Sequence, residues 1–133
     1  MHLLDSDIRL ILIGGSSFER WTTSISERVL CIQTSRFSEV LSYIDAADIA
    51  VLPRSVCSGF PIKVLNYLAV GTPVVVAEGS DIGLEGCVSF SNGDSRAMAE
   101  TILSLLQNDE EMKRLANIGK MQVLTKYTWE SAA

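Results

Sequence analysis

Lys63 and Asn66 are the two side chains in this sequence whose types and spacing best suit ligand binding. They lie in residues 58–76, which read as a glycine-containing loop, an amphipathic helix, a stop and a buried strand. Backbone N–H groups at the start of such a helix attract an anion, for example a diphosphate. Because Lys63 and Asn66 are three residues apart on the helix, both side chains can face one ligand. The stretch therefore predicts an anion-binding site with a hydrogen-bonding amide beside it.

A sheet of parallel strands is expected to position this loop. Five apolar runs predict strands, at 8–13, 29–32, 48–52, 74–77 and 88–90. Strands that alternate with helical patterns form βαβ units and a parallel sheet, and right-handed crossovers place helices on both faces. We therefore expect residues 1–133 to form a single Rossmann-like α/β domain, a doubly wound parallel sheet of about five strands with helices on both faces.

Two helices are expected inside this sheet order. Apolar residues at helical spacing predict a helix over 35–47, with Thr34 or Ser35 as its cap. The helix within 58–76 should stop at Gly71, because glycine commonly follows a helix end and Pro73 cannot continue the helix.

Three further helices complete the expected elements. A short one contains Trp21 and Ile25. The last two have apolar stripes made of Met98, Ile102, Leu105 and Leu106, and of Met112, Leu115, Ala116 and Val123. Asn108 and Glu111 have the spacing of a capping box at the start of the final helix.

In an open parallel sheet, ligands bind at the loops that follow the carboxyl ends of the strands. In this sequence those loops are expected at 14–18, 33–37, 53–62 and 78–85.

Composition excludes several other classes of function. The chain has 133 residues, is 47% hydrophobic and carries a net charge of −5. An extended nucleic-acid surface needs clustered Lys and Arg, so nucleic acid is not an expected partner. The longest apolar run is far shorter than the roughly 20 residues of a membrane helix, so we expect no transmembrane segment.

The few cysteines and the lone histidine exclude other chemistry. Cys31, Cys57 and Cys87 are odd in number, widely spaced and form no C-x-x-C pair, which favours a reducing, cytoplasmic location over a disulfide framework. A catalytic thiol at Cys57 would need a nearby histidine, but the only histidine is His2. Without a second histidine or clustered carboxylates, no metal site is expected.

Several ordered motifs make the chain resemble a known family. Those motifs are 10–15, a strand with its glycine turn; 43–53, a helix followed by a strand; 59–76; and 127–129. In this order they are similar to the carboxyl-terminal, donor-binding half of retaining GT-B glycosyltransferases of the sucrose-synthase and mannosyltransferase type, the glycosyl transferases group 1. The resemblance implies a nucleotide-sugar donor as substrate and no metal or other cofactor.

The resemblance also implies which residues bind the donor. In that family two glutamates eight positions apart contact the sugar and the nucleotide ribose, and they fall on Ser58 and Asn66 here. The spacing is kept, but both carboxylates are absent. Asn66 can still hydrogen-bond to ribose hydroxyls, whereas Ser58 offers the sugar a weaker contact. No residue is assigned as catalytic.

Other donor-binding positions follow in the same way. The backbone N–H groups of Phe60 and Ile62 would face the phosphates, and Lys63 would neutralise one of them. Residues 34–36, which include Arg36, follow the strand where the family binds the base. The full implied set is Gly14, Gly15, Ser16, Arg36, Ser58, Gly59, Phe60, Ile62, Lys63 and Asn66.

Each of these residues has a purely structural alternative. Lysine and arginine at positions such as Lys63 and Arg36 are more often solvated surface residues than ligand contacts. Asn66 is also suited to pairing with a backbone carbonyl, and Gly14 with Gly15 to a tight strand exit.

Part of the family's architecture is not recognised in this sequence. The acceptor half is missing, and so is the central first strand of the donor half, whose loop supplies an Arg and a Lys to the leaving diphosphate. The family's donor half has the strand order 3-2-1-4-5-6. If the remaining five strands close into one sheet without the first strand, their order is 2-1-3-4-5 in this chain's own numbering. We expect this closure. The alternatives are that an upstream segment or another chain supplies the strand, or that open edges lead to a homodimer.

The sequence therefore predicts the nucleotide-sugar-binding portion of a glycosyltransferase, transferring a hexose to a glycan or other acceptor. We expect this chain alone to lack the acceptor half and full activity, so an acceptor-domain partner is implied. The alternative is an inactive remnant of the fold that acts as a binding or interaction module. A phosphorylated receiver domain and a dinucleotide oxidoreductase are disfavoured, because neither the required acidic residues nor a G-x-G-x-x-G follows a strand.

Overall fold

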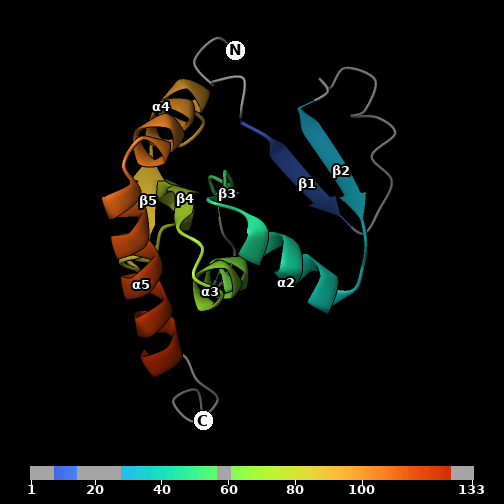
Figure 1. The fold of residues 1–133 in the computed structure, drawn as a ribbon. Coiled ribbons are helices and arrows are strands. Elements are labelled where there is room, and N and C mark those ends of the chain that lie inside the picture. The colour runs from blue at the N-terminus through green and yellow to red at the C-terminus, as the bar shows by residue number, and fades with distance from the viewer. Residues whose placement is uncertain (1–7, 15–27, 57–60, 127–133) are drawn as a thin grey trace.

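A computed structural model describes residues 8–14, 28–56 and 61–126, which form the strands and helices drawn in Figure 1. The strands are β1 (Leu10–Gly14), β2 (Val29–Gln33), β3 (Ala50–Leu52), β4 (Val74–Ala77) and β5 (Cys87–Phe90). The helices are α2 (Phe37–Ala46), α3 (Ile62–Ala69), α4 (Ser95–Leu106) and α5 (Asp109–Lys126), with a short 3-10 turn, η1 (Glu78–Ser80), after β4. Every expected strand is present to within two residues at each end, and the helix expected around Trp21 lies outside the described residues.

All strand pairs are parallel, but they form two sheets instead of one. β1 pairs with β2, and β3, β4 and β5 form a three-stranded sheet in that order. Figure 1 shows the β1–β2 pair standing apart from β3, with α2 leading from one sheet to the other. The α/β class with parallel strands is therefore confirmed. The expected closure of β1 onto β3 is wrong for the described part of the chain.

Packing explains why closure does not occur. The buried hydroxyl of Thr72 donates a hydrogen bond to the carbonyl of Ile44 at 2.8 Å, which holds the end of α2 beside the start of β4. Ile44 itself is buried. Among the described residues, neither hydrophobic core cluster contains a residue of β1 or β2. The helix that links the sheets is thus fixed to one of them, and no core contact draws the β1–β2 pair against β3.

β4 is the centre of the core, because its valines are buried on both faces. Val74 and Val76 pack in a cluster with Val64 and Leu68 of α3. Val75, on the opposite face, lies in a second cluster that includes residues of α4 and α5. The alternation of side chains along a strand produces these two layers. Helices on both faces are therefore confirmed for the three-stranded sheet.

The end of α3 follows the expected glycine stop. Gly71 adopts a positive φ of 85°, a conformation that costs glycine little. Its N–H donates to the carbonyl of Leu68, and the N–H of Thr72 donates to the carbonyl of Tyr67 at 3.0 Å. This pair of bonds is the Schellman arrangement, which satisfies the last carbonyls of a helix. It turns the chain directly into β4.

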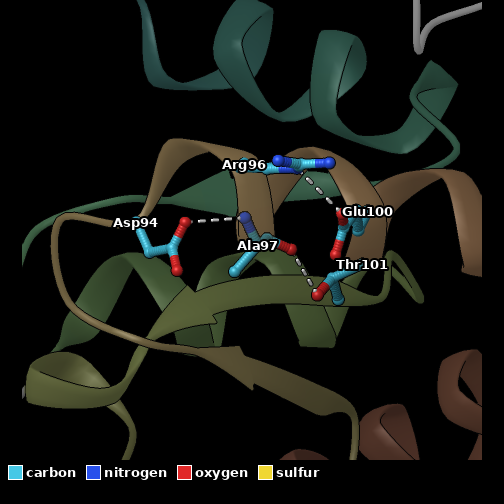
Figure 2. A network of polar contacts seen from close by, with 5 residues as sticks. All are labelled: Asp94, Arg96, Ala97, Glu100 and Thr101. Carbon is cyan, nitrogen blue, oxygen red and sulfur yellow. Dashed lines mark hydrogen bonds and ion pairs between the residues drawn. The ribbon is translucent and has the colours of Figure 1, made fainter.

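Side-chain caps start the last two helices. Asp94 accepts a hydrogen bond from the N–H of Ala97 at 2.9 Å and so caps α4, which the sequence analysis missed (Figure 2). Asn108 accepts from the N–H of Glu111 at 3.1 Å, as expected for α5. The Glu111 carboxylate pairs with Arg114 at 2.6 Å. Each cap satisfies an N–H group that has no partner within its helix.

The start of α2 differs from expectation. The helix begins at Phe37, and Arg36 stands at the cap position without a side-chain cap bond. The Thr34 hydroxyl bonds within the turn before the helix. It accepts from the N–H of Arg36 at 3.1 Å and donates to the Glu39 carboxylate at 2.7 Å. Neither Thr34 nor Ser35 is therefore the helix cap, because Thr34 stabilises the turn that precedes the helix.

Candidate functional site

Three loops meet at the carboxyl edge of the β3–β5 sheet, and we call them the rim. They are residues 53–56 after β3, residues 78–80 after β4 and residues 91–94 after β5. Parallel strands place these loops on one edge. The N–H of Gly79 donates to the Asn92 side chain at 2.8 Å, and the Ser80 hydroxyl donates to the carbonyl of Arg54. Hydrogen bonds thus hold all three loops together.

The rim is also closely packed at Gly79. A Cβ atom at this position would lie 1.5 Å from the carbonyl oxygen of Ser55. The backbones of the β3 and β4 loops can therefore meet only because Gly79 has no side chain. Sequence reasoning placed this loop at the ligand edge but singled out neither Ser80 nor Asn92. The sequence signal that could have identified Ser80 and Asn92 was the presence of short polar residues directly after strands of a parallel sheet.

The leading end of α3 follows the β3 loop. Pro61 is buried at the cap position and makes no side-chain cap bond, whereas Ile62 is 65% exposed. The first N–H groups of a helix have no partner within the helix. Because proline has no N–H, the free backbone donors of the helix itself begin at Ile62.

Lys63 and Asn66 lie on the outer side of α3. The inner side is defined by Val64 and Leu68, which are 1% and 0% exposed. At 100° per residue, Asn66 is opposite this buried pair and Lys63 is within about 60° of Asn66. Lys63 is exposed and Asn66 is partly exposed. Neither side chain is turned into the core, so both can be reached by a ligand beside the helix.

Gly14 and Arg36 lie together at the carboxyl ends of β1 and β2. The carbonyl of Gly14 accepts a hydrogen bond from the N–H of Thr34 at 3.0 Å, and the Thr34 hydroxyl accepts from the N–H of Arg36. The Arg36 side chain is exposed. Within the described residues, no hydrogen bond joins this group to the rim.

The remaining predicted donor-binding residues are Gly15, Ser16, Ser58, Gly59 and Phe60, and they lie outside the described residues. Their placement stays a prediction. Cys57, the other residue considered in that loop, also lies outside.

The chemistry of the described cysteine and tyrosine near the core argues against a nucleophile there. Burial, assisted by the negative charge of Asp81, raises the pKa of the Cys87 thiol to about 12. Burial also raises the pKa of Tyr67. Both groups keep their protons at neutral pH, and Cys87 packs against the core cluster that includes Val74 and Val76.

Other features of the described residues carry no chemistry of their own. No group of three or more acidic, histidine or cysteine side chains in 8–14, 28–56 and 61–126 is arranged to hold a metal ion. In the same ranges, no helix combines the length and apolarity needed to cross a bilayer. An open hollow adjoins the amino end of β3, at the edge opposite the rim, and is lined by Asp48, Leu106, Asp109, Met112 and Lys113.

The parallel strands, the helices on both faces of the three-stranded sheet and the loops gathered at one edge define a partial Rossmann-like α/β domain. The chain belongs to the family Glycosyl transferases group 1, whose family model matches residues 1–108. It is 31% identical to the amylovoran biosynthesis glycosyltransferase AmsK of Erwinia amylovora over 132 residues, covering 87% of this chain and 32% of that protein. The resemblance to the carboxyl-terminal half of GT-B glycosyltransferases is confirmed.

Solved structures share the fold. Sucrose-phosphate synthase from Thermosynechococcus elongatus superposes with a TM-score of 0.80 at 21% identity, over 92% of this chain and 35% of that chain. HepE from Anabaena, solved in complex with UDP, superposes with a TM-score of 0.76 at 15% identity, over 95% of this chain and 40% of that chain. The chain thus spans about a third of the length of the proteins it matches.

Proposed function

We propose that this chain is the nucleotide-sugar-binding portion of a glycosyltransferase that transfers a hexose from an activated donor to a glycan or other acceptor. Family membership supports sugar transfer in general, and HepE, which shares the fold, was solved with UDP. The observation that carries the proposal is the exposed leading end of α3. It follows the β3 loop and carries Lys63 and Asn66 on the side away from the core.

In this proposal the donor lies against the first turn of α3. The N–H groups of Phe60 and Ile62 bind the diphosphate, because helix starts attract anions. Lys63 adds a full positive charge, and Asn66 hydrogen-bonds to the ribose hydroxyls. Ser58 and Gly59 border the sugar.

The β1–β2 side supplies the rest of the donor site. Gly14, Gly15 and Ser16 line the cleft beside the donor, and Arg36 stands where the base would lie. Gly14 and Arg36 are already joined through Thr34 in the structure. A ligand that contacts both α3 and this group would bridge the two sheets.

Stabilising the leaving diphosphate is the main task of a transferase that uses no metal. Among the described residues near the β3 loop, Arg54 and Lys63 carry positive charge and are exposed. Arg54 is held at the rim through its own carbonyl, which accepts the Ser80 hydroxyl. We assign both side chains to neutralising the diphosphate.

A titration of the isotope-labelled chain with UDP-glucose, GDP-mannose and ADP-glucose tests the proposal by NMR. We expect one donor to shift the amide signals of Gly14, Arg36, Lys63 and Asn66 at millimolar concentration, while signals of α4 stay in place. If the chain is folded and none of the three donors moves these signals, the nucleotide-sugar assignment is wrong and the inactive-remnant alternative is favoured.

A matched pair of lysine variants locates the site. Lys63→Ala removes the proposed phosphate partner, and we expect donor affinity to fall about tenfold, since a hydrogen bond to a charged group contributes roughly 1.5 kcal/mol. Lys113→Ala removes an exposed lysine beside the hollow at the opposite edge and should leave affinity unchanged. Equal affinities for both variants would place the donor elsewhere.

A further inference from the structure

The outward side of α5 combines apolar side chains with lysines. Its inward side is the row of Leu115, Gly119 and Val123, which are all buried. At about 100° per residue, Met121 and Leu124 lie about 160° and 140° around the helix from Gly119. They are 68% and 51% exposed, and residues three apart on a helix are neighbours. Met121 and Leu124 therefore form one exposed apolar spot on the side of α5 that faces away from the core.

Close packing fixes which side of α5 faces outward. A Cβ atom on Gly119 would lie 2.8 Å from a methyl group of Leu68 and 3.0 Å from the Cα atom of Gly86. Only glycine allows the helix to approach this closely, so a rotated helix would not fit. The Gln122 side chain adds a hydrogen bond, since its oxygen accepts the N–H of Glu85 at 2.9 Å. Figure 1 shows α5 at the margin of the molecule with α3 on its inner side, so the apolar spot faces solvent.

Beyond its first turn, α5 carries only positive charge. The acidic residues of the helix all lie in the first turn. From residue 112 to residue 126 the charged side chains are Lys113, Arg114, Lys120 and Lys126. Arg114 pairs with Glu111, whereas Lys113 and Lys120 are exposed and, in the described part of the chain, make no ion pair. Both lysines lie within about 40° of the apolar spot around the helix. We call the resulting set the α5 strip, which consists of Lys113, Lys120, Met121 and Leu124.

We propose that the α5 strip docks on the surface of a membrane that contains anionic phospholipid. Apolar side chains bordered by lysines suit the boundary between headgroups and acyl chains, where the apolar groups are buried and the lysines extend their charges to the headgroups. The strip is about 16 Å long and is positive in a chain whose net charge is −5, so anionic headgroups are its complement. Docking of this strip does not depend on nucleotide-sugar binding.

A second copy of this chain fits the α5 strip less well than a lipid surface does. A stable interface between two proteins buries about 800 Å² on each partner, and two partly exposed apolar side chains offer far less than that. A lipid surface needs no matching patch of this size, because it offers both negative charge and hydrocarbon wherever the strip meets it.

The docking should be reversible and sensitive to salt. One lysine near an anionic leaflet raises the binding constant about fivefold at physiological salt. The screening length falls from about 30 Å at 0.01 M salt to about 8 Å at 0.15 M salt, so the attraction should weaken over this range.

Vesicle co-sedimentation of the 133-residue chain tests the proposal. We expect binding to vesicles of phosphatidylcholine mixed with phosphatidylglycerol, little binding to phosphatidylcholine alone, and a loss of binding as NaCl is raised. The double variant Lys113→Gln with Lys120→Gln should lower the binding constant at least about tenfold. The double variant Met121→Ser with Leu124→Ser should lower it at least about tenfold as well, because the apolar contact is lost. All four side chains are exposed, so both variants should fold, which circular dichroism checks.

Matched controls change the same kinds of side chain elsewhere. Lys63→Gln removes an exposed lysine of α3, and Val56→Ser removes an apolar side chain that is 77% exposed after β3. Both control variants should bind the anionic vesicles as the wild type does. A spin-labelled phosphatidylcholine in anionic bicelles locates the docked side by NMR, and it should broaden the amide signals of the α5 strip more than those of α2.

Four results would overturn the proposal. The first is a folded chain that does not bind the anionic vesicles. The second is an equal loss of binding in the strip variants and the controls. The third is stronger broadening in α2 than in the α5 strip. The fourth is a dimer in analytical ultracentrifugation that Met121→Ser with Leu124→Ser abolishes, which would identify a second copy as the occupant.

Discussion

Thr72 shows how one side chain decides the position of an element. It is 1% exposed, and its hydroxyl donates to the carbonyl of Ile44 at the end of α2. A buried carbonyl left without a partner costs about 1–3 kcal/mol. Thr72 therefore holds α2 against the β3–β5 sheet, although nothing in its sequence neighbourhood marks it as more than a residue of the turn.

A valine in place of Thr72 tests this role. Thr72→Val keeps the shape of the side chain and removes the donor, so we expect the free energy of unfolding to fall by roughly 2 kcal/mol in urea denaturation. Thr125→Val is the control, because its hydroxyl is exposed and bonds within its own helix. A loss no larger than that of the control would contradict the proposed anchor.

Cys87 makes stability depend on pH in the alkaline range. The ordinary pKa of the thiol is 9.0, and burial raises the folded-state pKa to about 12. Above pH 9 the unfolded chain loses this proton while the folded chain keeps it. The contribution of Cys87 is therefore fully present below pH 9 and is lost as pH rises from 9 to about 12.

Urea denaturation at about pH 8 and about pH 10 measures this effect. We expect the wild-type free energy of unfolding to fall by up to about 1 kcal/mol per pH unit above 9. The pKa of Tyr67 is also raised, but from 10.0, so its own loss is only beginning at the upper end of this range. Cys87→Ala should lose less stability between the two pH values. An equal loss in this variant would assign the pH dependence to other groups.

At the scale of elements, α4 depends on a cap that its apolar pattern does not reveal. The Asp94 carboxylate accepts the N–H of Ala97, and further along the helix Arg96 pairs with Glu100 at 3.3 Å (Figure 2). The cap satisfies a donor that would otherwise have no partner in the helix, whereas the ion pair is 82% and 59% exposed. Exposed pairs contribute little to stability.

Alanine variants at these two positions should separate the effects. Asp94→Ala is expected to lower the free energy of unfolding by about 1 kcal/mol. Glu100→Ala should change it by less than about 0.5 kcal/mol. Thermal and urea denaturation measure both, and a larger loss for Glu100→Ala than for Asp94→Ala would reverse the assignment.

At the scale of the whole molecule, the two sheets should differ in local stability. The described core clusters are built around β4 and contain no residue of β1 or β2. Regions with few buried apolar contacts open more readily than the core. We therefore expect the amides of Leu12 and Ile32, which pair β1 with β2, to exchange at least about a hundredfold faster than those of Val75 and Val76 in native-state hydrogen exchange.

The same experiment identifies the unit that opens. Low urea should accelerate the β4 amides, which report global unfolding, and leave the β1–β2 amides nearly unchanged, because their opening exposes little surface. Equal rates and equal urea dependence in both sheets would mean that the chain unfolds as one unit.

Much of the fold follows from local patterns that could be read from the sequence. The valine run of β4, the stop at Gly71 and the Asn108 cap are set by neighbours within a few residues, and all three appear as expected. The position of Ile62, Lys63 and Asn66 on the exposed side of α3 follows from the same local periodicity.

Only the tertiary structure decided how the elements combine. Some contacts depend on residues that are distant in the sequence, and no local pattern encodes them. They are the absent pairing of β1 with β3 in the described residues, the hydrogen bond from Thr72 to Ile44 and the close approach of Gly79 to Ser55. The sequence alone determined the parallel α/β class and the stop of α3 at Gly71, because hydrophobic periodicity and turn residues act locally. The division into two sheets depended on tertiary structure, because the backbone groups of a strand can hydrogen-bond only to a strand that the fold places beside it.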